Sequence, residues 1–187
     1  MAWTSPTTRS TGNLITAAIW NTDVVDNLSY LKGQTDSFTV LQIVHTQTGA
    51  VATGTTVMPL DDTIPQNTEG DEYMTRAITP TSATNKLLIE ALWIGANNVT
   101  SGNIGVALFQ DTTAGALATS IGVSSVAGDM IAVPLRHEMV AGTTSATTFK
   151  IRAGGHSAGT TTFNGRGGGR IHGGVMASSI RIAEIKV

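Results

Sequence analysis

The chain contains no cysteine among its 187 residues, which excludes disulfide bonds and thiolate metal sites. Charged residues make up only 13% of the sequence and aromatic residues 5%. The charged share is about half that of an ordinary globular protein. With a net charge of −2 and a pI near 6.0, the chain also lacks the basic surface that binding to nucleic acid or to an anionic membrane requires.

Long apolar runs are missing as well. No stretch approaches the roughly 20 apolar residues that cross a bilayer, and no basic region followed by an apolar run opens the sequence as in a secretory signal peptide. We therefore expect no membrane insertion, and assembly in a cytoplasm. The polar surface is built from Thr, Ser, Asn and Gly, which suits a permanent assembly because large interfaces are depleted in charge.

What the chain does have begins with one amphipathic helix. A polar segment, MAWTSPTTRSTGNLI, precedes TAAIWNTDVVDNLSYLKG, in which four apolar residues recur at helical spacing. Thr16 is the expected N-cap, Ile15 has the position of a hydrophobic staple, and Gly33 has that of the C-terminal cap. The apolar stripe consists of Trp20, Val24, Leu28 and Leu31.

A lone helix of about four turns is only marginally stable in water, so this stripe needs a partner. The partner is the chain's own β-domain, a second copy of the chain or another protein. We favour an intermolecular role, with Trp3 and Ile15 joining the stripe as attachment residues. The sequence thus divides into an arm and helix over residues 1–35 and a β-body over 36–187.

Beyond Gly33, short apolar runs alternate with Gly, Thr, Ser, Asn and Pro turns, as in a sandwich or barrel. Roughly eight strands without intervening helices favour a jelly roll, so the predicted fold class is mainly β, an N-terminal arm and single α-helix followed by a jelly-roll-like β-sandwich. Residues 86–94 are apolar on both faces, and we expect this strand to be covered on both faces. A step in the pattern predicts a bulge near Ala183 and Glu184. Clear strand patterns occupy 38–45, 86–94, 104–109, 130–140, 147–153 and 179–187.

Candidate catalytic and metal-binding motifs are weak. Residues 155–159 match G-x-S-x-G, but a Thr-rich strand follows where a nucleophile elbow needs a helix, and no Asp comes after Ser157. GRGGGR lacks the features of a phosphate-binding loop and predicts a turn. Five carboxylates in residues 61–73 could bind Ca²⁺, although solvated turns have the same composition. We predict neither a catalytic residue nor a resident metal or cofactor.

The loop over 156–174 is poor in side chains, and backbones of this kind approach closely at a turn, a symmetry axis or a neighbouring subunit. It carries three side chains that could contact an acidic or glycan surface: Arg166, Arg170 and His172.

Several segments resemble proteins of tailed bacteriophages. The opening WTSPTTRSTGNLITAAIWNTDVVDNLSYLKG resembles a segment found at the start of phage structural proteins, and VMPLDDTIPQNTEGDEY, ITPTSATNKLLIEALW, VALFQDTTAGALA and PLRHEMVAGTTSATTFKIRAG resemble a β-domain of virion proteins. The resemblance implies a non-enzymatic virion structural protein with a trimeric, jelly-roll-like body, exposed on the particle and fixed by its N-terminal part.

Two placements on the particle follow from this resemblance. The preferred one is a homotrimeric capsid decoration or cement protein bound to the major capsid protein or another virion protein, because the chain has no shaft repeat, heptad array or collagen-like stretch. The alternative is a short tail or head fibre that docks by its N-terminal segment and contacts the host surface, including its glycans, with the β-domain. A glycan-cleaving enzyme is disfavoured because no paired carboxylates lie among aromatic residues.

Overall fold

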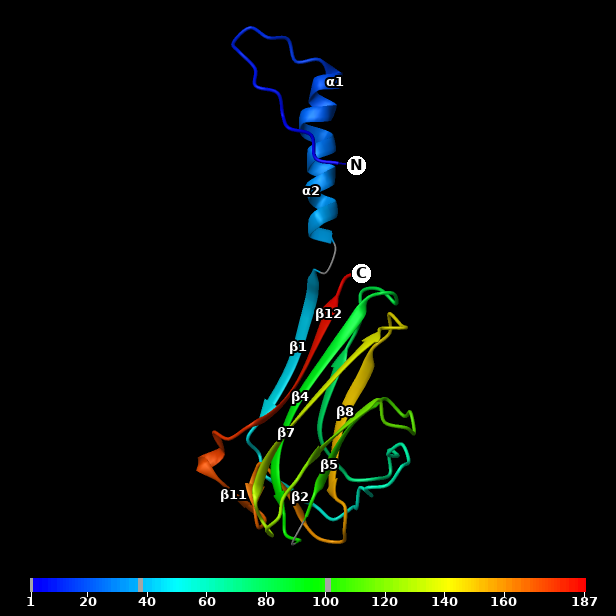
Figure 1. Cartoon of the computed structure of the whole chain (residues 1–187), viewed down its shortest axis with the longest axis vertical. Helices are drawn as coiled ribbons and strands as arrows, with labels where there is room; N and C mark the ends of the chain where they lie inside the picture. The colour runs from blue at the N-terminus through cyan, green and yellow to red at the C-terminus, as the bar shows by residue number, and fades with distance from the viewer. Residues whose placement is uncertain (1, 37–38, 100–101) are drawn as a thin grey trace.

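The structure is a computed structural model that describes residues 2–36, 39–99 and 102–187. An N-terminal arm and a helix stand at one end of a sandwich of antiparallel sheets (Figure 1). The fold is mainly β and jelly-roll-like, as the strand patterns predicted.

The helical part consists of α1 (Ala17–Trp20), a π-helical segment η1 (Asn21–Asp26) and α2 (Asn27–Asp36), and a short 3₁₀ turn η2 (His172–Gly174) lies near the C-terminus. The strands are β1 (Val40–Thr48), β2 (Ala52–Gly54), β3 (Asp71–Ile78), β4 (Lys86–Asn97), β5 (Ile104–Gln110), β6 (Ala118–Gly122), β7 (Met130–Val140), β8 (Thr147–Gly155), β9 (Thr161–Phe163), β10 (Gly165–Arg166), β11 (Gly169–Arg170) and β12 (Ser178–Ile185).

The larger sheet has six strands in the order β1-β12-β4-β9-β2, with β7 paired to β4, and the smaller sheet has the order β3-β8-β5-β6. The long strand β4 pairs with β12 over its first part and with β9 near its end. It therefore runs from the end of the sandwich nearest the helix to the opposite end (Figure 1).

The core lies between the two sheets. It is formed by side chains that alternate strictly between the inner and the outer face along each strand. In β8, Phe149, Ile151 and Ala153 are buried while Lys150 and Arg152 face outward, which confirms the predicted pattern. Trp93 and Phe163 fill the middle of the core, where Tyr73 stacks on Phe163 with ring centroids 5.0 Å apart.

Three predictions about individual elements need correction. The prediction that β4 is covered on both faces is wrong, because Leu88, Leu92 and Ile94 on its outer face are only half-buried. The predicted bulge is on the partner strand: Leu41 of β1 is the extra residue, whereas β12 pairs regularly with β4. The helix also continues through Gly33, which does not adopt the left-handed conformation of a C-terminal cap.

Pro134 lies on β7, a strand of the larger sheet whose pairing is with β4. Its side chain is exposed. A proline at an edge strand removes no hydrogen bond that the sheet needs.

Candidate functional site

The N-terminal helix begins as the sequence predicts. Thr16 has extended backbone angles, and its hydroxyl accepts a hydrogen bond of 3.3 Å from the amide of Ile19. This satisfies one of the amides that a helix start leaves without a partner.

The middle of the helix is a π-helical segment, which no pattern in the sequence predicts. Its wider turn changes the direction in which the residues from Asn21 to Asp26 face, because π-helical hydrogen bonds join residues five apart instead of four apart. Val24 is half-buried, whereas Trp20 and Leu28 are 52% and 60% exposed. The stripe predicted from a regular helical period is therefore offset at its centre.

The arm folds back along the helix and is fixed to it by one asparagine. The Asn27 side chain accepts a 3.0 Å hydrogen bond from the Thr4 amide and donates one of 2.7 Å to the Thr4 carbonyl. Nearby, the ring of Trp3 lies 6.4 Å from that of Tyr30. Trp3 is thus partly engaged within its own chain, although 47% of it stays exposed.

Because the arm folds back, the tip of the appendage is not its first residue. The arm runs beside the helix and turns beyond the start of α1 (Figure 1), where the Asn13 amide donates to the Ser10 carbonyl. Leu14 and Ile15 follow this turn, and both are exposed. Leu14 lies outside the predicted helical stripe, and only its position directly after Gly12 and Asn13 could have indicated a tip.

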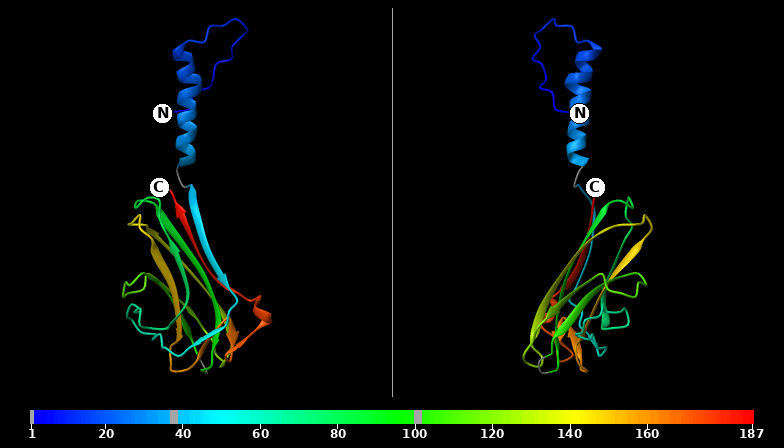
Figure 2. Two further views of the ribbon diagram at one scale, coloured as in Figure 1. Left: turned by 180° about the vertical axis from the view of Figure 1, so that it is seen from behind. Right: turned by 45° about the vertical axis from the view of Figure 1, so that its right-hand side comes forward.

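The apolar side chains of this appendage find no cover on their own body. Figures 1 and 2 show the helix standing clear of both sheets, and none of the described helical segments has an extensive contact with a strand. The exposed large apolar side chains of this part are Trp3, Leu14, Ile15, Trp20, Val25, Leu28 and Leu31. The alternative in which the helix packs on the β-domain is therefore not what the structure shows.

A second apolar surface lies on the outer face of the larger sheet. Ile43 of β1 is in register with Ala183 of β12, which is in register with Leu88 of β4. Two residues further along β4, the outward Glu90 lies between Arg181 and Arg136 in the ladder. The row of Ile43 and Leu88 is apolar as far as β4 and ends at Glu138 of β7, and Ile43 is half exposed.

The three loop residues expected to form one contact surface do not lie together. Arg166 and Arg170 occupy successive rungs of the β10–β11 hairpin, so their side chains leave opposite faces of the ribbon. The Arg170 side chain lies over Gly174, and His172 opens η2 with a φ of 53°. Arg166 instead lines a hollow beside the end of β4.

The glycine-rich segment itself forms a tight turn, as predicted. Gly167 and Gly168 both have positive φ, which a two-residue hairpin of type I′ requires. Gly165 allows close approach of the two strands, because a Cβ there would lie 2.0 Å from the Gly169 carbonyl oxygen.

The acidic loop uses its carboxylates to hold its own turns. Asp71 accepts hydrogen bonds from the Thr56 amide and hydroxyl at 3.0 and 2.8 Å, and Glu69 accepts one of 2.9 Å from the Gln66 amide. Hydrogen bonds from Thr63 lower the pKa of Asp61 below its ordinary value. Across the described ranges, no group of three or more acidic, His or Cys residues is arranged to hold a metal ion.

Ser157 lies in a bend between β8 and β9, and the next element is a strand rather than a helix. The neighbouring His156 has its Nδ1 3.4 Å from the Asn103 carbonyl oxygen. The local structure that a nucleophile elbow needs is therefore not formed around Ser157. In the part of the chain that the structure describes, no helix combines the length and the apolar character of a membrane span.

Residues 53–187 match the family model of the Pgp3 C-terminal domain. The chain belongs to the Pgp3 C-terminal domain family. The match covers the sandwich from the middle of β2 onward. The arm and helix, which are the segments predicted to attach the protein, lie outside it, and so does β1.

No curated protein matches the chain in sequence. Among solved structures, Eiger TNF from S. frugiperda is 10% identical, with a TM-score of 0.44, and the match covers 78% of this chain and 92% of that one. A chain of infectious bursal disease virus, Gx strain, is 13% identical with a TM-score of 0.34, covering 79% and 37%. A CocE/NonD family hydrolase from Staphylococcus aureus is 8% identical with a TM-score of 0.33, covering 87% and 46%. These similarities are too distant to bear on function.

Proposed function

We propose that this protein is a non-enzymatic structural component of a tailed-bacteriophage particle, a homotrimer held on the particle by its N-terminal arm and helix. One observation carries the proposal: the apolar side chains of the helix are exposed and turned away from any cover by their own body. Trp20, Leu28 and Leu31 are each about half exposed or more. Exposed apolar groups of this kind mark a binding surface for another protein. The resemblance of the first 33 residues to phage structural proteins supplies the kind of particle.

The trimer part of the proposal rests on the outer face of the larger sheet. Apolar residues of three strands, including Ile43, Leu88 and Pro134, lie on this face without a layer of helices over it (Figure 2). Burial of such a face between identical bodies would remove apolar area from water. The charged row of Glu90 between Arg181 and Arg136 would fix the register of the packed faces.

For the position on the particle, we propose decoration of the capsid shell, with the major capsid protein or another virion protein as the partner of the helix. The second candidate, a short fibre, is favoured by the arrangement of the helix beyond one end of the elongated body (Figure 1). In that arrangement the opposite end of the sandwich would face the host cell. Particles that lack the protein separate the two: shells that burst on heating support decoration, and intact particles that no longer adsorb support a fibre.

The experiment that tests the proposal removes residues 1–38 and keeps the body from β1 onward. Since the core lies wholly between the two sheets, we expect the truncated body to fold, to sediment at three times the chain mass and to be missing from purified particles. Its incorporation is compared with that of the full chain expressed in the same way.

Normal incorporation of the truncated body would refute the attachment role of the helix. A monomeric mass for the body at micromolar concentration would refute the trimer.

A further inference from the structure

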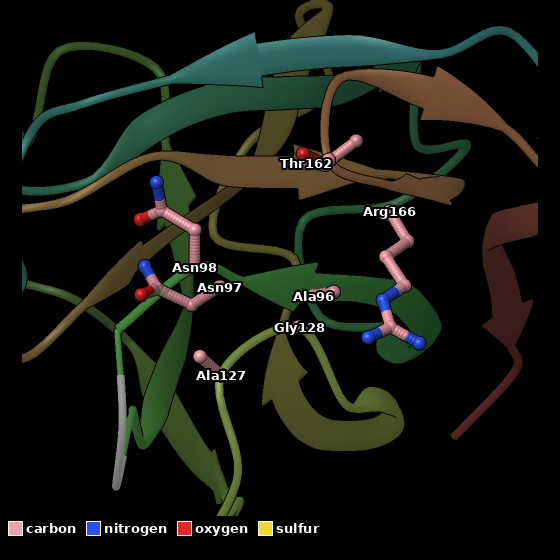
Figure 3. A pocket seen from close by; sticks show the side chains of 8 residues that line it. Ala96, Asn97, Asn98, Ala127, Gly128, Thr162 and Arg166 are labelled. Atoms are coloured by element: carbon pink, nitrogen blue, oxygen red, sulfur yellow. The ribbon is translucent and has the colours of Figure 1, made fainter.

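A hollow whose lining is mainly apolar but carries one arginine lies at the end of the sandwich farthest from the helix. Its volume is about 200 Å³, and a second hollow of about 230 Å³ shares Asn98, Thr162 and Gly167 with it. The two therefore form one continuous depression. Its first part is lined by Ala96, Asn97, Asn98, Ala127, Gly128, Thr162, Arg166 and Gly167 (Figure 3).

Among the described residues of this lining, Arg166 supplies the only cationic side chain. Its guanidinium lies against the backbone of Gly128, where a Cβ would come within 2.9 Å of Nε. Gly128 has a φ of +81°, so both its conformation and its missing side chain make room for the arginine. Figure 3 shows Arg166 on one side of the hollow and Asn98 on the other, with Ala96 and Gly128 between them.

The lining offers several hydrogen-bond donors and few free hydrogen-bond acceptors. Among the described residues, the Arg166 guanidinium has neither an ion pair nor a hydrogen bond to a protein group. Asn98 uses its carbonyl oxygen to accept from the Thr160 amide at 2.7 Å, which leaves its amide hydrogens available. Thr162 accepts from the Gly168 amide at 3.1 Å, which leaves its hydroxyl hydrogen available.

No carboxylate competes for the arginine. None of the lining residues that the structure describes is acidic, and Asp129, next to Gly128 in sequence, has its carboxylate 3.4 Å from the Ser124 hydroxyl instead. A free guanidinium beside amide and hydroxyl donors recognises a group that only accepts, and its planar fork matches a carboxylate.

We propose that this depression, hereafter the Arg166 site, binds an acidic sugar unit of a surface polysaccharide, with the sugar carboxylate on Arg166 and ring hydroxyls near Asn98 and Thr162. The combined depression is in the size range of a small ligand site, which is larger than a simple anion needs. The methyl groups of Ala96 and Ala127 provide an apolar floor for a sugar ring. The Arg166 site goes beyond the proposed function, since it needs neither the helix nor a particle.

The test measures binding of glucuronate to the purified full-length chain by calorimetry and by saturation-transfer NMR, with glucose, acetate and inorganic phosphate as comparison ligands. We expect glucuronate to bind and glucose and acetate to bind far more weakly. Arg166→Ala should weaken glucuronate binding by about 10- to 100-fold, because a charge-assisted hydrogen bond is lost. Arg166→Lys keeps the positive charge but loses the planar guanidinium. Its affinity for glucuronate should therefore lie between those of the wild type and of Arg166→Ala.

Arg170→Ala is the matched control, since Arg170 belongs to the same hairpin and does not line the depression. It should leave glucuronate binding unchanged. The Arg166 site is refuted if glucuronate does not bind, if glucose binds as well, or if Arg170→Ala weakens binding as much as Arg166→Ala. Equal binding of acetate or phosphate would reduce it to an anion site and overturn the sugar assignment. Because no particle is present, each of these results leaves the attachment proposal unaffected.

Discussion

Glu184 is the residue on which the end of the sandwich nearest the helix depends most directly. Its side chain is fully buried, and its carboxylate accepts hydrogen bonds from Asn85, from Thr81 and, at 2.6 Å, from Gln42 of β1. Burial opposes the charged form, but the hydrogen bonds from Asn85, Gln42 and Thr81 outweigh it and lower the pKa to about 2. One carboxylate thereby ties the loop before β4 to the strand that follows the helix.

The free energy of unfolding should therefore decrease in acid, because Glu184 becomes protonated. The folded-state pKa of about 2 lies below the ordinary value of 4.5, so this contribution is complete above pH 4.5 and is lost as the pH falls towards 2. It amounts to roughly 3 kcal/mol of the free energy of unfolding. Glu184→Gln should remove that pH dependence and lower stability at neutral pH, as measured by denaturant unfolding between pH 7 and pH 2.5.

The control for this prediction is Glu138→Gln. Glu138 lies on the surface with its carboxylate 2.7 Å from Lys86, and exposed ion pairs contribute little to stability. A Glu184→Gln variant with the stability profile of wild type, or of Glu138→Gln, would show that the buried hydrogen bonds do not stabilise the fold.

At the scale of elements, the helix and the arm support each other without the sandwich. The Thr4–Asn27 pair and the Trp3–Tyr30 contact join positions more than 20 residues apart, and Arg9 lies 3.5 Å from Asp23. These contacts orient the arm but leave the outer side of the helix uncovered. Since a solitary helix of this length is only marginally stable in water, we expect the helix to open frequently until a partner covers it.

Trp20→Ala separates attachment from folding. Because Trp20 is 52% exposed and belongs to the appendage, we expect it to change the free energy of unfolding by less than about 0.5 kcal/mol. Its loss should weaken binding to particles by about 2 kcal/mol or more if it is an interface hot spot. Binding is titrated on particles that lack the protein, and unfolding is followed by denaturant.

Val175→Ala is the matched control, since Val175 is 85% exposed on the body. Equal losses of attachment and stability in Trp20→Ala would show that the helix belongs to the folded core.

Local patterns predicted most elements but not how their surfaces are used. The alternation of Phe149 and Ile151 indicates both the strand and its buried face, because period 2 is a property of the strand itself. The apolar outer face of β4 looked like a doubly covered strand, since hydropathy does not reveal whether the cover comes from the same chain. Gly33 looked like a helix end, although glycine also occurs inside helices at a cost of about 1 kcal/mol.

The candidate sites were harder to predict for the same reason. The pairing of Asn27 with Thr4 and the meeting of Asn98 with Arg166 join distant segments, and no local periodicity records such contacts. The stripe of Trp20 and Leu28 was found because it repeats along one helix. The offset of this stripe by the π-helical segment could not be predicted, because residue spacing indicates a shared face only when the helix is regular.

At the scale of the whole molecule, the two ends differ in chemistry. One end carries a helix with exposed apolar side chains, and the other carries the Arg166 site with its unpaired guanidinium (Figures 1 and 3). A weakly charged body with 13% charged residues separates them. This separation allows one end to be held by a particle while the other remains accessible.

Amide hydrogen exchange tests most directly the claim that the helix finds its cover outside its own chain. The exchange of residues 17–34 is followed by mass spectrometry in the purified protein and in intact particles, with β8 as an internal reference. The account predicts rapid exchange of the helix in the free protein, strong slowing on the particle, and β8 protection that is the same in both. A helix already protected in the free protein, with no change on the particle, would contradict it.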